Sequence, residues 1–259
     1  MAFSSQKDLA VVIVSWNVKD AVLENLRSIF ASSPMPALDV ILVDNASHDG
    51  TVDAVRSAFP EVRVIANMEN LGFAKACNQG LAASSARHAL LLNPDMRVEP
   101  DAFAKTVAYL DAHPDVAVLG AKLIGQDGKA MHHIRRFPTL WSQAVIALKL
   151  QRVFPGVIAR YMGEDLDLGK EQDVDSVRGS YFAMNHTSLE KVGMLDERYF
   201  IWMEEVDYCR QVKQKGMRVR YVPSIVAHDL VGKSFSQRNK WWKRKQFSKS
   251  MAKYFLKWL

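Results

Sequence analysis

The chain has 259 residues, of which 49% are hydrophobic and 24% charged, and this composition is that of a globule with an ordinary packed core. Its two cysteines, Cys77 and Cys209, lie far apart without metal-ligand spacing, which indicates neither a disulfide framework nor a cysteine zinc site and favours a reducing, cytoplasmic compartment. The formal charge of +6 is concentrated after residue 229, where nine Lys and Arg occur with no acid. No stretch reaches the roughly 18 apolar residues that would span a bilayer.

Short apolar runs alternate with helical patterns in the first hundred residues. Strands are predicted at 10–15, 40–44, 62–66 and 88–93, and helices between them at 21–31, 51–58 and 73–83. This alternation is typical of an α/β fold with a mostly parallel central sheet flanked by helices. The glycine spacing of a dinucleotide fingerprint and the GxxxxGK[ST] sequence are absent, so neither a Rossmann oxidoreductase nor a P-loop NTPase is supported.

The pattern changes after Pro100. The predicted elements are a helix at 101–112, a strand at 116–123, a strand-like run at 174–185, a helix at 204–215 and a strand at 218–222. Between the strand at 116–123 and the strand-like run at 174–185 the chain is irregular, aromatic and basic. We expect one compact catalytic domain over residues 1–229, with its nucleotide-binding half at 1–100, followed by a basic amphipathic segment at 230–259.

Polar residues follow three of the predicted strands. They form the groups Ser15-Trp16-Asn17, Asp44 to Thr51, and Asn93-Pro94-Asp95. Ligands of open α/β sheets bind at the carboxyl ends of strands. Each group taken alone also has a structural explanation, as a helix cap or a turn. Their coincidence at successive strand ends indicates a ligand site.

Seven motifs together resemble inverting family 2 glycosyltransferases of the GT-A fold, and in particular their bacterial rhamnosyltransferase-like branch. The resemblance covers nearly the whole chain, and the motifs occur in the family's order: VIVSWN, VDNASHDGT, NLGFAKACNQGL, LLLNPD, RGSYFAM, FIWMEEVDYCRQ and HDLVGKS. It implies that residues 101–229 form the acceptor half. It also implies an enzyme that moves a sugar from a nucleotide diphosphate to a saccharide or lipid-linked acceptor in bacterial surface polysaccharide synthesis, with rhamnose as the sugar of this branch.

The resemblance implies a site for Mg²⁺ or Mn²⁺ at Asn93-Pro94-Asp95, which corresponds to the family's DXD-like motif. Such ions take hard oxygen ligands and stabilise the charge that develops on a leaving diphosphate. Asp95 is the expected metal ligand, while Asn93 replaces the first carboxylate and is expected to bind the ribose or a metal-bound water. His228 matches a histidine that adds a ligand in relatives; alternatively it is a surface histidine in a loop.

The nucleotide pocket is also implied by the resemblance. Asp44 corresponds to the residue that accepts a hydrogen bond from a pyrimidine base, which favours a UDP or dTDP donor. The other residues expected at the nucleotide are Ser15, Asn17, Asn45, Asn70, Asn78 and Asn93.

An inverting transfer needs a carboxylate that takes the proton from the acceptor hydroxyl. The family position falls on Glu205, where most relatives have Asp, and Asp207 is the neighbouring candidate. The alternative is that these acids only occupy the favourable first turn of a helix. Gly179 and Ser180 match the loop that contacts the donor sugar and the acceptor, where glycine permits close approach.

Two other functions are alternatives to glycosyl transfer. A sugar nucleotidyltransferase would need a Gly-rich basic loop after its first strand, and SWNVKD lacks it. An inactive family member that acts as a carbohydrate-binding or membrane scaffold remains compatible with the departures at Asn93 and Glu205.

The C-terminal segment reads as an amphipathic basic helix, with Phe247, Met251, Tyr254, Phe255 and Trp258 at helical spacing. One interpretation is that residues 238–259 lie on an anionic membrane surface, which would make the protein peripheral on the inner face of the cytoplasmic membrane. The other is that the aromatic face packs on the catalytic domain. Nucleic-acid binding is less favoured, because no recognised module accompanies the basic residues.

Overall fold

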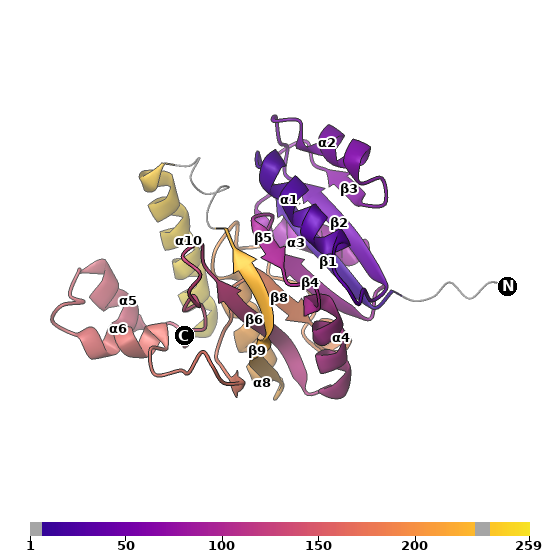
Figure 1. Cartoon of the computed structure of the whole chain (residues 1–259). Coiled ribbons are helices and arrows are strands. Elements are labelled where there is room, and N and C mark those ends of the chain that lie inside the picture. Colours follow the sequence, from indigo (N-terminus) through magenta and orange to yellow (C-terminus); the bar gives the residue numbers. More distant parts are fainter. Residues whose placement is uncertain (1–6, 231–238) are drawn as a thin grey trace.

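The computed structural model describes residues 7–230 and 239–259. The described strands form one sheet with helices on both faces (Figure 1). The strands are β1 (Leu9–Ser15), β2 (Leu38–Asp44), β3 (Arg63–Ala66), β4 (His88–Leu92), β5 (Met96–Val98), β6 (Val116–Ile124), β7 (Gln172–Asp173), β8 (Tyr181–Met184) and β9 (Arg218–Asp229). The helices are α1 (Lys19–Phe30), α2 (Thr51–Ala58), α3 (Phe73–Ala82), α4 (Ala102–Ala112), α5 (Leu140–Ala147), α6 (Pro155–Met162), α7 (His186–Lys191), α8 (Glu204–Gln214) and α10 (Lys240–Trp258).

The first half of the sheet is parallel, in the order β3-β2-β1-β4. Strands β1, β2 and β4 are mostly apolar and largely buried, as expected for a sheet covered on both faces, whereas the edge strand β3 has no fully buried residue. The predicted elements of this half agree with the observed ones to within two residues at each end. Because β2 and β4 lie on opposite sides of β1, the strand order reverses there, and such a switch point leaves a crevice at the carboxyl ends of the strands.

The second half of the sheet is mixed. Strand β8 pairs antiparallel with both β4 and β6, β9 runs parallel to β6, and β5 and β7 pair antiparallel with β9. The expected α/β class with a large central sheet is confirmed, while parallel pairing dominates only in the first half of the sheet.

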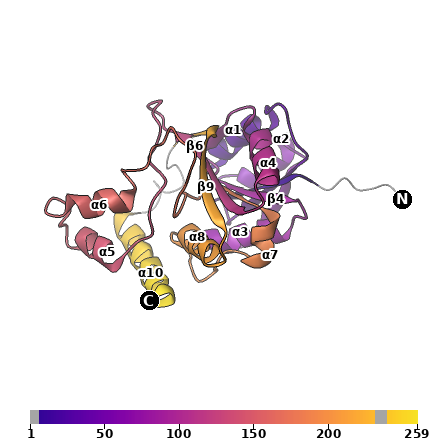
Figure 2. The same ribbon diagram turned by 90° about the horizontal axis from the view of Figure 1, so that it is seen from below.

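Two apolar layers hold the helices to the sheet. One layer packs α1, α2 and α4 against one face, and the other packs α3 and α8 against the opposite face (Figure 2). Helix α3 approaches β1 closely at Gly80, where a Cβ atom would lie 2.3 Å from Cγ1 of Val12. The absence of a side chain at Gly80 therefore sets the height of α3 above the sheet.

The strand-like run at 174–185 is only partly a strand, because β8 begins at Tyr181. Ser176 instead exchanges two backbone hydrogen bonds of 3.0 Å with Arg135, outside the main ladder. The strand predicted at 218–222 continues to Asp229, since a bulge between its pairings with Ala121 and Lys122 accommodates Pro223.

The irregular stretch contains two helices that the sequence reading missed. Thr139 and Ser142 form a capping box at the start of α5, and Pro155 occupies the first turn of α6. The two helices project from the sheet on the side of α10 (Figures 1 and 2). Large apolar side chains are exposed between the two helices, among them Leu148 at 68% and Val153 at 65%.

Helix α10 packs on the catalytic body, which is the second of the two interpretations of the C-terminal segment. Met251 and Tyr254 are buried against Tyr199 and Met203. The phenol of Tyr254 accepts a hydrogen bond of 3.0 Å from Arg210 of α8. The predicted aromatic face is therefore a packing face. Residues 231–238, which include Lys233, Arg238 and the end of the HDLVGKS motif, lie outside the described residues.

Candidate active site

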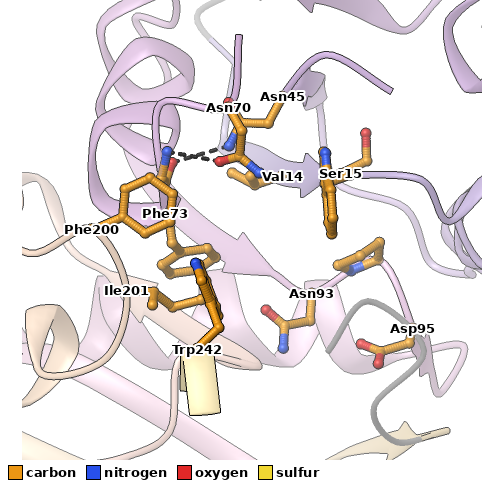
Figure 3. A pocket seen from close by; sticks show the side chains of 13 residues that line it. Val14, Ser15, Asn45, Asn70, Phe73, Asn93, Asp95, Phe200, Ile201 and Trp242 are labelled. Atoms are coloured by element: carbon orange, nitrogen blue, oxygen red, sulfur yellow. Dashed lines mark hydrogen bonds between the residues drawn. The ribbon is translucent and has the colours of Figure 1, made fainter. Parts of the chain in front are cut away.

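A cavity lies at the switch point of the sheet, and we call it the donor cavity. Its lining comes from the ends of β1 and β4, the loop before α3, the loop before α8, and α10. Figure 3 shows Phe73, Phe200, Ile201 and Trp242 on one side, with Ser15, Asn93 and Asp95 opposite. The predicted ligand site at successive strand ends therefore exists as a single concave site with aromatic and polar walls.

Asp44 lies beneath this cavity and is 1% exposed. Its carboxylate accepts hydrogen bonds from the Ser15 hydroxyl at 2.7 Å and from the backbone and hydroxyl of Ser47 at 2.8 and 2.5 Å. The side chain of Asn17 accepts a hydrogen bond of 2.7 Å from the backbone of His48. Asp44 and Asn17 thus position Ser15 and the 44–48 loop, and direct recognition of a base by Asp44 stays a prediction.

Asn45 and Asn70 shape the cavity wall through Gly72. Asn45 donates to the Gly72 carbonyl at 3.1 Å, and the Gly72 amide donates to Asn70 at 3.0 Å (Figure 3). Gly72 has a φ of +87°, and a Cβ atom there would lie 2.5 Å from the Phe200 carbonyl oxygen. Only glycine fits this turn without moving the Phe200 loop.

Asn78 does not line the donor cavity, and its expected role at the nucleotide stays a prediction. Its side chain exchanges hydrogen bonds of 2.8 and 3.0 Å with the backbone of Leu195 and donates to Glu197 at 3.0 Å. Asn78 lies on the buried side of α3 and is 6% exposed. Its amide therefore fastens α3 to the loop that precedes α8.

Asp95 lines the donor cavity and is 7% exposed, and Asn93 stands beside it. The Asn93 side chain donates to the Ser180 hydroxyl at 3.2 Å, which brings the predicted sugar-binding loop to the end of β4. Within residues 7–230 and 239–259, no three His, Cys, Asp or Glu side chains gather so that they alone could hold a metal ion.

The assignment of His228 as a metal ligand stays a prediction. The residue lies within β9, opposite Arg97 of β5, rather than in a loop. Its Nε2 lies 2.6 Å from Oε1 of Glu99, and it does not line the donor cavity. The neighbouring Asp229, on the other face of the strand, is 2% exposed and pairs with Arg178 at 3.0 Å.

A narrow junction connects the donor cavity with a second cavity. It shares Phe73, Asn93 and Ile201 with the donor cavity, and it shares Arg178, Trp202 and Glu205 with the second cavity. Gly179 and Ser180 also line the junction. The ideal Cβ position of Gly179 is 3.8 Å from Oε1 of Glu205, so a small residue there keeps the carboxylate accessible.

Glu205 stands at this junction, at the start of α8. Its Oε2 atom is buried without a hydrogen-bond partner among the described residues. Burial raises the pKa of Glu205, although the positive charge of Arg178 and the Gly179 backbone partly oppose the shift. Burial and the adjacent Glu205 carboxylate raise the pKa of Glu204 well above its usual range. Two adjacent carboxyl groups with raised pKa values at a cavity are typical of acid–base sites.

Asp207, the other candidate base, lies outside the cavities and is fully buried. Its two carboxylate oxygens accept hydrogen bonds from four side chains: Lys257 at 2.7 Å, Trp258 at 2.7 Å, Gln211 at 2.8 Å and Tyr199 at 3.2 Å. Two of these partners belong to α10. Asp207 therefore anchors that helix, and its role as the neighbouring candidate base stays a prediction.

Two functional features were missed in the sequence. Trp242 of α10 lines the donor cavity, with its ring centroid 6.1 Å from that of Phe200. Arg178 lines the junction next to Glu205, although it was visible in the sequence only as the first residue of the RGSYFAM motif. Both contacts join segments far apart in the chain, which local patterns do not reveal.

The fold and the arrangement of these cavities define the chain as a protein of the GT-A glycosyltransferase class. A mannosyltransferase from Pyrobaculum calidifontis, solved with GDP-Man and Mn²⁺, superposes with a TM-score of 0.66 at 20% identity, over 98% of this chain and 64% of that one. The S. aureus TarS fragment 1–349 with UDP-GlcNAc gives 0.61 at 16% identity, over 90% of this chain and 61% of that one. The chain thus spans about two thirds of the length of these structures.

The chain belongs to glycosyl transferase family 2, whose model matches residues 10–193. It is 28% identical over 229 residues to the N-acetylglucosaminyl-diphospho-decaprenol L-rhamnosyltransferase of Mycobacterium tuberculosis, covering 83% of this chain and 74% of that protein. It is 25% identical over 158 residues to the rhamnosyltransferase WbbL of Escherichia coli, covering 59% of this chain and 57% of that protein. The family that the motifs resembled is therefore confirmed. None of the helices in the described part of the chain is long and apolar enough to cross a membrane.

Proposed function

We propose that this protein is a metal-dependent, inverting glycosyltransferase. A nucleotide diphosphate sugar binds in the donor cavity, and the acceptor enters from the second cavity. The observation that carries the proposal is the position of Glu205 at the junction of the two cavities, with one carboxylate oxygen that has no hydrogen-bond partner among the described residues. A base at that point reaches an acceptor hydroxyl on one side while the sugar lies on the other.

In the proposed reaction the acceptor oxygen attacks the anomeric carbon as the bond to the diphosphate breaks. Glu205 takes the proton from the attacking hydroxyl, and the configuration at the anomeric carbon inverts. The raised pKa of Glu205 suits this role, because a stronger base accepts the proton more readily. Gly179 and Ser180 border the place where the sugar would sit.

Asp95 and Asn93 are the residues proposed to hold Mg²⁺ or Mn²⁺ at the donor cavity. Such ions commonly bind proteins through one or two carboxylates and take further oxygens from substrate phosphates. One nearly buried carboxylate beside a carboxamide at the cavity fits that pattern. When bound, the ion would supply positive charge to the leaving diphosphate.

For the substrates, we propose a pyrimidine nucleotide donor, dTDP or UDP, carrying rhamnose, and a lipid-linked saccharide acceptor. The names of the similar rhamnosyltransferases support the sugar, and the mycobacterial relative acts on a lipid-linked diphosphosugar by its name. Asp44 remains the candidate residue for binding the pyrimidine ring of the nucleotide. This contact would require its hydrogen bonds with Ser15 and Ser47 to rearrange. The product would belong to bacterial surface polysaccharide synthesis.

A lipid-linked acceptor places the reaction at an anionic membrane surface, and we propose peripheral binding there. Exposed cations remain on the outer side of α10 after its aromatic face is packed: Lys240, Arg244, Lys245, Lys249 and Lys253. Each such cation contributes about 1 kcal/mol near an anionic leaflet. Co-sedimentation with vesicles containing anionic lipid tests this, and equal binding to neutral vesicles would contradict it.

Calorimetric titration of UDP, dTDP, GDP and ADP, with Mn²⁺ and with EDTA, tests the donor site. We expect one pyrimidine diphosphate to bind only with metal, and Asp95→Ala to abolish that dependence while the fold is kept. Unchanged affinity in this variant would remove the metal assignment. Binding of the nucleotide without any transfer or donor hydrolysis would favour the alternative of an inactive scaffold.

A further inference from the structure

The second cavity is strongly basic. It has a volume of about 450 Å³, which lies within the range of small-molecule sites. The basic side chains of its lining are Arg135, Arg136, Arg178, His132 and His133, and the lining has a single carboxylic acid, Glu205. A neutral saccharide would not need such a surplus of cationic groups, so the lining indicates an anionic ligand.

Several of these groups are buried and lack hydrogen-bond partners among the described residues. They include both ring nitrogens of His132, both ring nitrogens of His133, and Nε of Arg136. His133 is only 5% exposed. Buried polar nitrogens in folded proteins are nearly always paired, and a cluster of unpaired ones at a cavity indicates that a ligand supplies the partners.

The electrostatic environment of His133 is consistent with this. Burial lowers the pKa of His133 to about 3, and the positive charges of Arg178, His132 and Arg135 lower it further. The ring is therefore neutral and offers one N–H donor, while the field around it is positive. The positive field would stabilise an anion bound here, and no acidic side chain would have to leave the cavity to admit it.

The three arginines differ in how they are held. Arg136 pairs with Asp165 at 2.5 Å, and Arg178 pairs with Asp229 at 3.0 Å. The backbone of Arg135 is fixed by its pair of hydrogen bonds with Ser176, whereas its side chain makes no hydrogen bond or ion pair with the rest of the described chain. Arg135 is thus a positioned guanidinium that is free to bind a ligand.

We propose that the second cavity binds the phosphate groups of an acceptor that carries its sugar on a diphosphate. The sugar hydroxyl lies at Glu205, and the diphosphate lies on Arg135, Arg136 and the His132–His133 pair. Guanidinium groups suit this ligand because they bind phosphate oxygens in a bidentate manner. This inference rests on the proposed function, since it names the class of acceptor that the same site takes.

The test measures acceptor binding without the donor. Intact protein in EDTA is titrated by calorimetry with a short-chain alkyl N-acetylglucosaminyl diphosphate and, separately, with the uncharged octyl N-acetylglucosaminide. We expect the diphosphate to bind at least tenfold more tightly than the uncharged glycoside. Equal affinities for the two probes, or no binding of the diphosphate, would overturn the proposal.

Arg135→Gln is the informative variant, because it removes a charge from the cavity and no internal contact. We expect it to weaken binding of the diphosphate probe at least tenfold and to leave the uncharged glycoside and the metal-dependent nucleotide affinity unchanged. The matched control is Arg56→Gln on the exposed side of α2, which removes the same charge far from the cavity and should change neither. Undiminished binding of the diphosphate by Arg135→Gln would refute the site.

The titration with nucleotides distinguishes the proposed anion site from the proposed glycosyl transfer. If the diphosphate probe binds through Arg135 but no nucleotide binds, the proposed glycosyl transfer fails and the anion site stands. If a nucleotide binds with metal but the probe does not, only the anion site fails.

Discussion

Glu205 and Asp207 lie two positions apart in the same helical turn, yet the structure gives them opposite surroundings. Glu205 faces the junction with one oxygen that has no partner among the described residues, whereas Asp207 accepts hydrogen bonds from Tyr199, Lys257 and Trp258 that tie α8 to its neighbours. A sequence shows that both are acids near a helix start but not which one faces the substrate. The two side chains point in different directions because each residue of an α-helix is rotated by about 100° from the one before it.

Glu205→Gln tests the assignment of the base. The amide is nearly isosteric but does not accept the proton, so we expect transfer to fall by about 10² to 10⁴-fold. Donor affinity should stay close to that of the unaltered protein, and the variant should remain folded. Steady-state transfer, measured beside nucleotide titration, checks both; transfer at the original rate would exclude Glu205 as the base.

Glu204→Gln tests the buried carboxyl pair through stability. Glu204 is 3% exposed and its pKa in the folded protein is raised, so the folded state holds the proton more tightly than the unfolded state. Stability therefore falls as the pH rises above about 4.5, through the window up to the raised pKa. We expect Glu204→Gln to raise the free energy of unfolding by roughly 1–3 kcal/mol at pH 7, because the variant removes the cost of an unsatisfied buried group. At pH 4 we expect no change. Urea unfolding at the two pH values measures this, and an equal effect at both would contradict it.

The contact between α3 and β1 depends on Gly80. A methyl group there would meet Cγ1 of Val12, a stiff and 1% exposed side chain, so α3 must shift. We expect Gly80→Ala to lower stability by about 1–3 kcal/mol. Gly156→Ala in α6 is the matched control, since nothing lies within 4 Å of its Cβ position. Equal midpoints of urea unfolding for the two variants would show that the close approach is not needed.

The attachment of α10 depends on Asp207. Breaking a buried ion pair typically costs about 3–5 kcal/mol, and Asp207→Asn removes the charge that faces Lys257. We expect lower thermal stability and faster hydrogen exchange in residues 240–259. Asp53→Asn, an exposed acid of α2, serves as the control. Retained stability together with lost transfer would instead make Asp207 the base.

Elements built from local patterns were predictable, and those that depend on distant partners were not. The strands of the first half are continuous apolar runs bounded by polar residues, so their ends located the donor cavity. Strand β9 was cut short in the sequence reading because Pro223 has no N–H, and only the bulge opposite β6 shows how the strand continues. The contacts of Asn78 and His228 have the same origin, since their side chains pair with Leu195 and Glu99, which are distant in the sequence.

The whole molecule combines a sheet switch point with a helix from the far end of the chain. The crevice between β1 and β4 is open on one side, and Trp242 of α10 closes it. The C-terminal helix, which the sequence reading set apart as a basic segment, therefore completes the donor cavity. Composition and charge located that segment but gave no sign of which surface it covers.

The most direct test of glycosyl transfer is mass spectrometry of the product formed from dTDP-L-rhamnose and a short-chain alkyl N-acetylglucosaminyl diphosphate, with Mg²⁺ present. We expect the acceptor to gain one deoxyhexose, through a linkage inverted relative to the donor, and the Glu205→Gln protein to form almost none. UDP- and GDP-linked sugars are supplied in parallel to cover other donors. If no acceptor gains a sugar from any donor although a nucleotide binds, glycosyl transfer at this site is contradicted.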